Sequence, residues 1–134
     1  MSHRAEERHL AIKAVMMPGD TNPLGTIFGG VLLSYMDQAG AVGAQAEIRR
    51  RGWPEARLVT VAMNGVEFHQ PVLVGDVVSF WTRLVRTGRT SITMQVAVET
   101  DRNGQTLSLT QAEVVYVSVD TTGPHRRPRP LADE

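Results

Sequence analysis

A glycine-rich loop and the apolar segment that follows it contain the residues best suited to chemistry. The loop runs from Asp20 to Gly30 and ends in two glycines, and the apolar segment 31–46 carries one acidic residue, Asp37. The length and composition of this segment predict a buried helix, whose first N–H groups lack partners and favour negative charge. A carboxylate inside an apolar helix is costly unless it has a partner or a chemical role. The pattern therefore predicts a loop that brings a ligand to a helix N-terminus.

The remaining elements predict β-structure around this helix. A helix over 31–50 ends in the cations Arg49 to Arg51 and in Gly52, which suit the negative end of the helix dipole and a left-handed C-terminal residue. This basic run predicts a helix stop in preference to a nucleic-acid patch. The expected strands are 10–17, 58–63, 66–68, 76–86, 90–100 and 107–119, with a tight hairpin at 103–104 and a bulge near 110–112.

The long antiparallel strands need an apolar cover on one face, and the Ala- and Gly-rich helix is the candidate for it. We therefore expect an α+β fold in which one long helix is wrapped by a curved antiparallel sheet. Strand 76–86 is apolar on both of its faces, which predicts that a second subunit covers the outer one.

The composition narrows the class of protein. The chain has 134 residues with 42% hydrophobic content, enough for one domain with a core. Lys+Arg and Asp+Glu number 14 each, so the net charge does not point to nucleic acid or to a membrane surface. There is no cysteine, which excludes disulfides and a cysteine nucleophile and fits a reducing compartment. No signal peptide is visible, and we expect a soluble, cytoplasmic protein.

Several short motifs, in their order along the chain, carry a family resemblance. They are the Asn22-Pro23-Leu24-Gly25 and Phe28-Gly29-Gly30 pattern, Met36-Asp37, Val66-Glu67-Phe68 with Pro71-Val72, Gly75-Asp76, and Arg86-Thr87-Gly88-Arg89-Thr90-Ser91-Ile92. Together they resemble the hotdog-fold acyl-CoA thioesterases, in particular the YciA-like and cytosolic acyl-CoA hydrolase branch. The resemblance spans about residues 14–120 and gives three expected parts: a tail 1–7, a hotdog domain 8–120 and a Pro- and Arg-rich tail 121–134 without core residues.

The resemblance assigns chemistry to four residues. Asp37 corresponds to the catalytic carboxylate, and Asn22 to an amide near the thioester that the partner subunit contributes. The backbone of Gly29 and Gly30 corresponds to the donor that polarises the thioester carbonyl. Asp37 would act either as a general base on water or as a nucleophile, and the sequence leaves both routes open. From the residues alone, Asp37 could also be merely solvated beside the polar stripe of Ser34, Gln38 and Gln45, and Asn22 could be a turn residue.

A second set of residues is implied for the coenzyme. The turn that contains Arg86, Gly88, Arg89, Thr90 and Ser91 is similar to the family's coenzyme-binding strand, and the alternative is a solvated hairpin. We expect the arginines of the C-terminal tail, Arg126, Arg127 and Arg129, to belong to a disordered, solvated tail in preference to contacting the phosphates of the coenzyme.

Other candidate sites are weaker. His69 is the one histidine inside the fold and is expected to be structural. The other histidines, His3, His9 and His125, have no ligand spacing, so we predict no metal. Ser34 has no nucleophile-elbow motif, which argues against a serine hydrolase.

The sequence therefore predicts a hydrolase of fatty acid metabolism that converts acyl-CoA to a carboxylic acid and coenzyme A with no cofactor. The family implies a homodimer with active sites at the subunit interface, often assembled into a trimer of dimers, which is a hexamer. One alternative is a non-catalytic acyl-CoA sensor, for which we expect a DNA-binding module that the seven residues before the first strand do not accommodate. A less favoured one is a hotdog dehydratase or hydratase, which would need a histidine paired with an acid.

Overall fold

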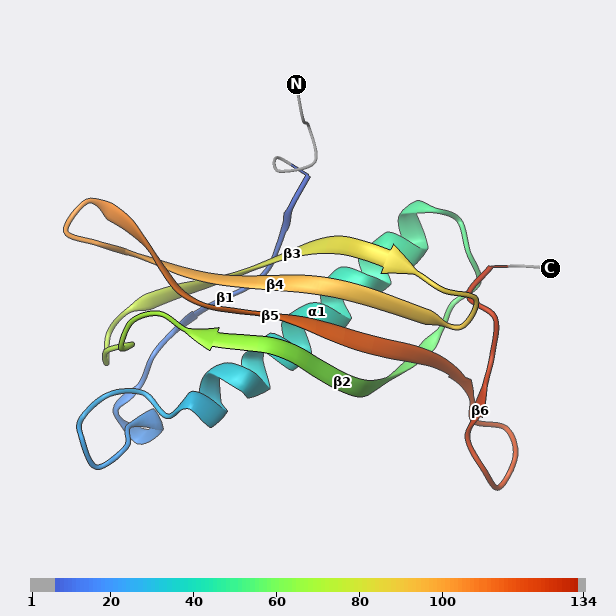
Figure 1. Cartoon of the computed structure of the whole chain (residues 1–134), viewed down its shortest axis with the longest axis horizontal. Helices are drawn as coiled ribbons and strands as arrows, with labels where there is room; N and C mark the ends of the chain where they lie inside the picture. The colour runs from blue at the N-terminus through green and yellow to red at the C-terminus, as the bar shows by residue number, and fades with distance from the viewer. Residues whose placement is uncertain (1–6, 133–134) are drawn as a thin grey trace.

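The computed structural model describes residues 7–132 and shows one long helix against a curved antiparallel sheet, as predicted (Figure 1). Residues 1–6 of the predicted N-terminal tail lie outside the described residues. The elements are β1 (His9–Val15), the 3₁₀ turn η2 (Pro18–Asp20), α1 (Gly29–Arg50), β2 (Arg57–Phe68), β3 (Val77–Thr87), β4 (Ser91–Arg102), β5 (Gln105–Asp120) and β6 (Arg127–Pro128). The sheet order is β1-β3-β4-β5-β2, with β6 paired to β5. Strand β2 is therefore an edge.

Two glycines let α1 lie close to the sheet. A Cβ at Gly43 would stand 2.7 Å from the Cβ of Thr82 on β3, and a Cβ at Gly40 would overlap the hydroxyl of Tyr116 on β5. The apolar side chains between helix and sheet, such as Met36 and Phe80, are fully buried. The small residues of the helix thus set the distance at which the sheet wraps around it.

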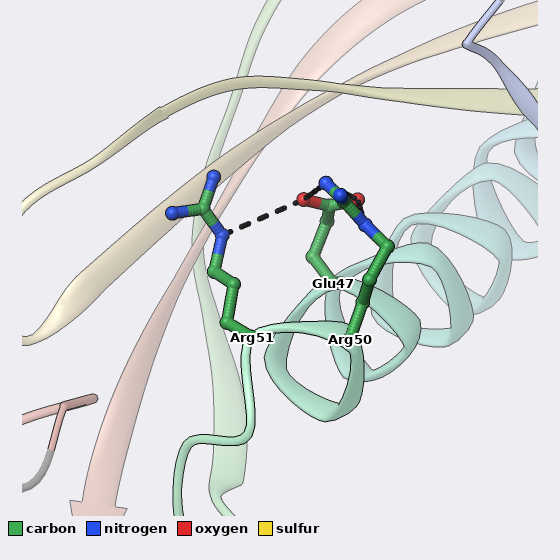
Figure 2. Close-up of polar contacts among 3 residues, drawn as sticks. All are labelled: Glu47, Arg50 and Arg51. Carbon is green, nitrogen blue, oxygen red and sulfur yellow. Dashed lines mark hydrogen bonds and ion pairs between the residues drawn. The ribbon is translucent and has the colours of Figure 1, made fainter.

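The helix begins two residues earlier than predicted and ends where expected. Phe28 precedes its first turn, and Gly52 beyond its end has φ +69°. Near this end Glu47 accepts hydrogen bonds from Arg50, at 2.7 Å, and lies 3.6 Å from Arg51 (Figure 2). The predicted helix stop is confirmed, because the basic run pairs with the helix's own acid.

The strands correct two expectations about β-structure. The break predicted at Asn64-Gly65 is a bulge within one continuous strand, since the β2–β5 register shifts between Asn64 and Glu67. The bulge predicted near 110–112 lies at Leu109, which is the extra residue between the pairs of β4 and β5. The hairpin at Asn103-Gly104 is confirmed, with φ of 53° and 78°.

The C-terminal segment is not the solvated tail without core residues that the composition predicted. Leu131 is only 2% exposed and belongs to the hydrophobic core. Its N–H donates to the carbonyl of Arg89 at 2.9 Å, and Arg127 pairs with Asp120 through β6. A single apolar residue among prolines and arginines has no periodic pattern, so the sequence does not indicate that Leu131 is buried.

Candidate active site

The loop before α1 is shaped by Asn22. Its Oδ1 accepts the N–H groups of Leu24 at 2.9 Å and Thr26 at 3.2 Å, and its Nδ2 donates to the Thr26 hydroxyl at 2.9 Å. Gly25 takes the left-handed conformation, φ +84°, that closes this turn. Asn22 is therefore a turn residue, as one of the two interpretations predicted. The second N–H of its side-chain amide can still donate a hydrogen bond to a ligand.

Backbone hydrogen bonds join the start of α1 to the segment after β2 and to the loop before the helix. Phe28 donates to the carbonyl of Asp20, and Ile27 donates to the carbonyl of Val72, each at 2.9 Å. Gly29 and Gly30 are the first two helical residues, so their N–H groups have no carbonyl inside the helix to bind. They are placed as donors for an oxygen that carries negative charge.

A cavity of about 390 Å³ adjoins this helix start. It is lined by Thr26, Ile27, Gly29, Leu32, Phe68, His69, Gln70, Pro71 and Val72. A larger cavity, about 590 Å³, lies near the other end of the helix, but most of its walls are charged groups such as Glu47, Arg50 and Arg83. The cavity beside Gly29 is the better match for an apolar group next to backbone donors.

Asp37 faces the edge strand. The hydroxyl of Thr60 on β2 donates to its Oδ1 at 2.6 Å, and the hydroxyl of Tyr116 donates to its backbone carbonyl at 2.6 Å. Burial, with the nearby charge of Asp37 as the second cause, raises the pKa of Tyr116, so the phenol stays protonated as a donor. The Thr60 hydroxyl thus orients the carboxylate, and the Tyr116 hydroxyl fixes the backbone that carries it, so Asp37 is not merely solvated.

A single chain does not bring all these groups together. Asp37 follows Gly30 by seven helical residues, a separation of roughly 11 Å along the helix axis. Reacting atoms must approach to about 3 to 3.5 Å. The Asp37 carboxylate therefore does not lie in direct contact with an oxygen bound at the glycine donors of the same chain.

The implied coenzyme segment lies at the opposite end of the sheet from the loop before α1 (Figure 1). Gly88 donates to the carbonyl of Ser91, and Ser118 donates to that of Thr90, each at 2.8 Å. The side chain of Arg86 is well exposed and lies 3.8 Å from Glu113. The C-terminal segment joins this turn through the bond to Arg89 described above.

Three site residues had no clear signal in the sequence. Thr60 and Tyr116 lie inside predicted strands, and no local motif marks them. The one available signal is that a tyrosine on the inner face of β5 needs a hydrogen-bond partner. Phe68 belongs to the Val66-Glu67-Phe68 motif, which assigns it no role, and in the structure its ring lies over the helix start.

His69 belongs to a polar network at the end of β2, which fits its predicted structural role. Its Nδ1 lies 2.9 Å from the Ser108 hydroxyl and its Nε2 lies 3.3 Å from Glu67 Oε1. The hydrogen bond with His69 lowers the pKa of Glu67. This hydroxyl, imidazole and carboxylate series resembles a serine-hydrolase relay, but Ser108 is not among the residues that line the cavity. We therefore assign the series to fixing the strand end. His69 also lines the cavity, and with its acid Glu67 it forms the pair that the hydratase alternative would need.

Comparisons with known proteins identify the family of this chain. The model of the thioesterase superfamily matches residues 24–107. The acyl-CoA thioester hydrolase YciA of Salmonella typhimurium is 42% identical over 127 residues, which cover 91% of this chain and 89% of the relative. Its namesake from Escherichia coli K12 is 38% identical over 99% of this chain and 98% of the relative.

Solved structures give the same picture. A hexameric thioesterase, y2039 from Yersinia pestis, is 39% identical with a TM-score of 0.79, covering 92% of this chain and 95% of that one. HI0827, described as a hexameric broad-specificity acyl-coenzyme A thioesterase, is 36% identical with a TM-score of 0.78, over 93% and 82% of the two chains. Among residues 7–132, no helix is long and apolar enough to cross a membrane.

Proposed function

Because this chain belongs to the thioesterase superfamily, we propose that it is a hotdog-fold acyl-CoA thioesterase, which hydrolyses acyl-CoA to a carboxylic acid and coenzyme A. One observation carries the assignment to this chain's own residues. Asp37 is held at the sheet edge by Thr60 and Tyr116, while unpaired N–H groups begin the same helix beside a partly apolar cavity.

The chemistry follows from these groups. The carbonyl oxygen of the thioester accepts hydrogen bonds from the Gly29 and Gly30 N–H groups, which stabilise the negative charge that develops on it. The oxygen of a water molecule, deprotonated by Asp37, bonds to the carbonyl carbon, and the carbon–sulfur bond then breaks. The thiolate of coenzyme A leaves and takes up a proton. Direct attack by Asp37 gives an anhydride that water then opens, and both routes require the carboxylate. Neither route needs a cofactor.

The active site is shared between two chains. Asp37 of one chain meets the Asn22 and Gly29 end of its partner, as the family resemblance implies for Asn22. The edge strand β2 supports this arrangement: it is 12 residues long, exposes 55% of Val61 and, among residues 7–132, pairs with β5 alone. Such an edge is a template for another strand. Two β2 edges paired about a two-fold axis would make one continuous sheet and bring Asp37 to the interface.

Higher assembly and coenzyme contacts complete the proposal. We propose a trimer of dimers, on the strength of the hexameric relatives and the exposed apolar residues at the start of β3, where Val77 is 44% exposed. The phosphates of coenzyme A would contact the cations of the β3–β4 turn, Arg86 and Arg89, beside Gly88, Thr90 and Ser91. A cytoplasmic location stays a prediction.

The direct test is release of free thiol from acyl-CoAs of several chain lengths. Asp37→Asn keeps the size of the side chain and should lower kcat by about 100-fold or more, as for loss of a general base. Asp101→Asn is the matched control and should leave kcat unchanged, since Asp101 accepts a hydrogen bond from the Thr106 hydroxyl at the β4–β5 hairpin and does not line the cavity. Near-normal turnover in Asp37→Asn would refute the assignment. Tight binding of acyl-CoA without thiol release would instead favour the sensor, and hydration of an enoyl-CoA would favour the hydratase.

A further inference from the structure

Phe68, the last residue of β2, occupies an unusual place for a large apolar side chain. It is 53% exposed, yet its ring lies against the first residue of α1. The ring atoms Cζ and Cε1 are 3.3 and 3.5 Å from the point where a Cβ on Gly29 would stand. The ring therefore covers the side of Gly29 that faces the cavity it helps to line.

The backbone on both sides of Phe68 is fixed. Phe68 pairs with Thr110 of β5, whose hydroxyl donates to the carbonyl of Glu67 at 2.5 Å. After it, the N–H of His69 donates to the carbonyl of Leu109 at 2.8 Å. The Glu67 carboxylate also accepts from Gln111 at 3.0 Å and meets the His69 ring. With both neighbours held, the backbone of Phe68 stays beside the helix start, so its ring is carried against Gly29.

This position determines what lies beside the ring during catalysis. In the proposed function, on which this step rests, the thioester carbonyl oxygen sits about 2.9 Å from an N–H nitrogen at the helix start. We place the carbon attached to that carbonyl in the part of the cavity beside the ring, since Gly29 and Phe68 line the same cavity. Rings pack against a CH₂ group at van der Waals distance, but an additional methyl group there has no room unless the ring moves.

We propose that Phe68 is a specificity-determining residue, which selects acyl groups that have no branch at the carbon next to the thioester carbonyl. The class of substrate is thus straight-chain acyl-CoA, or acyl-CoA with its first branch farther along the chain. Substrates branched at the first carbon are disfavoured by the contact with the ring.

The test compares three thioesters with the wild type and with Phe68→Ala. These are butyryl-CoA, isobutyryl-CoA, which is branched at the first carbon, and 3-methylbutyryl-CoA, which is branched one carbon later. One methyl group in a tight apolar site changes kcat/KM by about 10- to 200-fold. We expect the isobutyryl to butyryl ratio of kcat/KM to rise at least about 10-fold in Phe68→Ala, and the 3-methylbutyryl to butyryl ratio to change much less. Leu10→Ala, at an exposed apolar position on β1, is the control and should change neither ratio.

A double-mutant cycle with Gly29 isolates the ring contact. Gly29→Ala places a methyl group against the ring and should lower butyryl-CoA turnover, and the loss should be smaller in the Phe68→Ala background. Phe68→Leu, a milder change, replaces Phe68→Ala in both experiments if circular dichroism shows that the alanine variant does not fold. Unchanged ratios together with an undiminished effect of Gly29→Ala would overturn the role of Phe68. A wild type that releases thiol from none of the three thioesters would overturn the proposed function itself, which is a distinct result.

Discussion

Mixing two inactive variants tests whether the active site takes groups from two chains. One variant, Asp37→Ala, removes the carboxylate, and the other, Asn22→Ala, removes the amide at the opposite end of the site. The structure favours Asn22→Asp as a second version, because an aspartate keeps the Oδ1 that accepts the N–H groups of Leu24 and Thr26. Each parent dimer contains two damaged sites.

The expected recovery follows from the separation within one chain, roughly 11 Å along the helix. In a mixed dimer, one site receives both lesions and the other receives none. Random pairing of equal amounts makes about half of the dimers mixed, and half of their sites are intact, so roughly a quarter of wild-type activity should return.

The assay is thiol release after the two variants, carrying different tags, are unfolded and refolded together. Sequential affinity purification on both tags confirms that chains have exchanged. In a trimer of dimers the retained particles also contain unmixed dimers, so the purified material should still have roughly a quarter of wild-type activity. If both groups of a site came from one chain, every site would carry a lesion. Mixed dimers no more active than the parents would then refute the argument from helix length.

Three further predictions concern the rest of the chain. Arg89→Ala should raise KM for acyl-CoA but leave an acyl-pantetheine thioester without the nucleotide almost unaffected, as steady-state kinetics will show; equal effects would assign Arg89 another role. Leu131→Ala should lower the free energy of unfolding by about 2 to 5 kcal/mol in urea titrations, whereas Leu24→Ala, at a residue 89% exposed, should change it little, and equal values would contradict the burial of the C-terminal segment. His69→Leu should raise the pKa of Glu67 toward its ordinary value in carboxyl NMR titrations. Because that pKa is lowered in the fold, the contribution of Glu67 to stability is present above its ordinary pKa and lost as the pH falls through the lowered value, and a pKa unmoved by the substitution would exclude His69 as its cause.

Secondary-structure elements with a clear periodic or turn pattern in the sequence were predicted correctly. The alternation from Ile92 to Val98 gave β4, and Asn103-Gly104 gave its hairpin, because both depend on local backbone and side-chain preferences. The start of α1 was placed two residues late, since Gly29 and Gly30 have low helix propensity and the tertiary contacts of the loop decide the boundary.

Long-range contacts could not be predicted in the same way. Thr60 reaches Asp37 across 23 positions and Tyr116 reaches it across 79, so no local pattern links them. The resemblance to a family named Asp37, Asn22 and the glycines, but it did not indicate what orients the carboxylate. Leu131 was missed for the opposite reason, because one apolar residue has no period at all.

The contact between Gly40 and Tyr116 has a consequence for how sequences of this kind can diverge. The Tyr116 hydroxyl occupies the volume that a Cβ at position 40 would need, and it binds the backbone of Asp37 from that place. A residue larger than glycine at position 40 therefore requires the Tyr116 ring to shift or to be replaced by a smaller side chain, and either change disturbs the hydrogen bond to the backbone of the proposed catalytic residue. The two positions are therefore coupled: once the glycine is lost, a tyrosine at position 116 collides with the side chain at position 40. Descendants that keep the chemistry should keep both residues, and those that have lost one should show altered residues at the other and around Asp37.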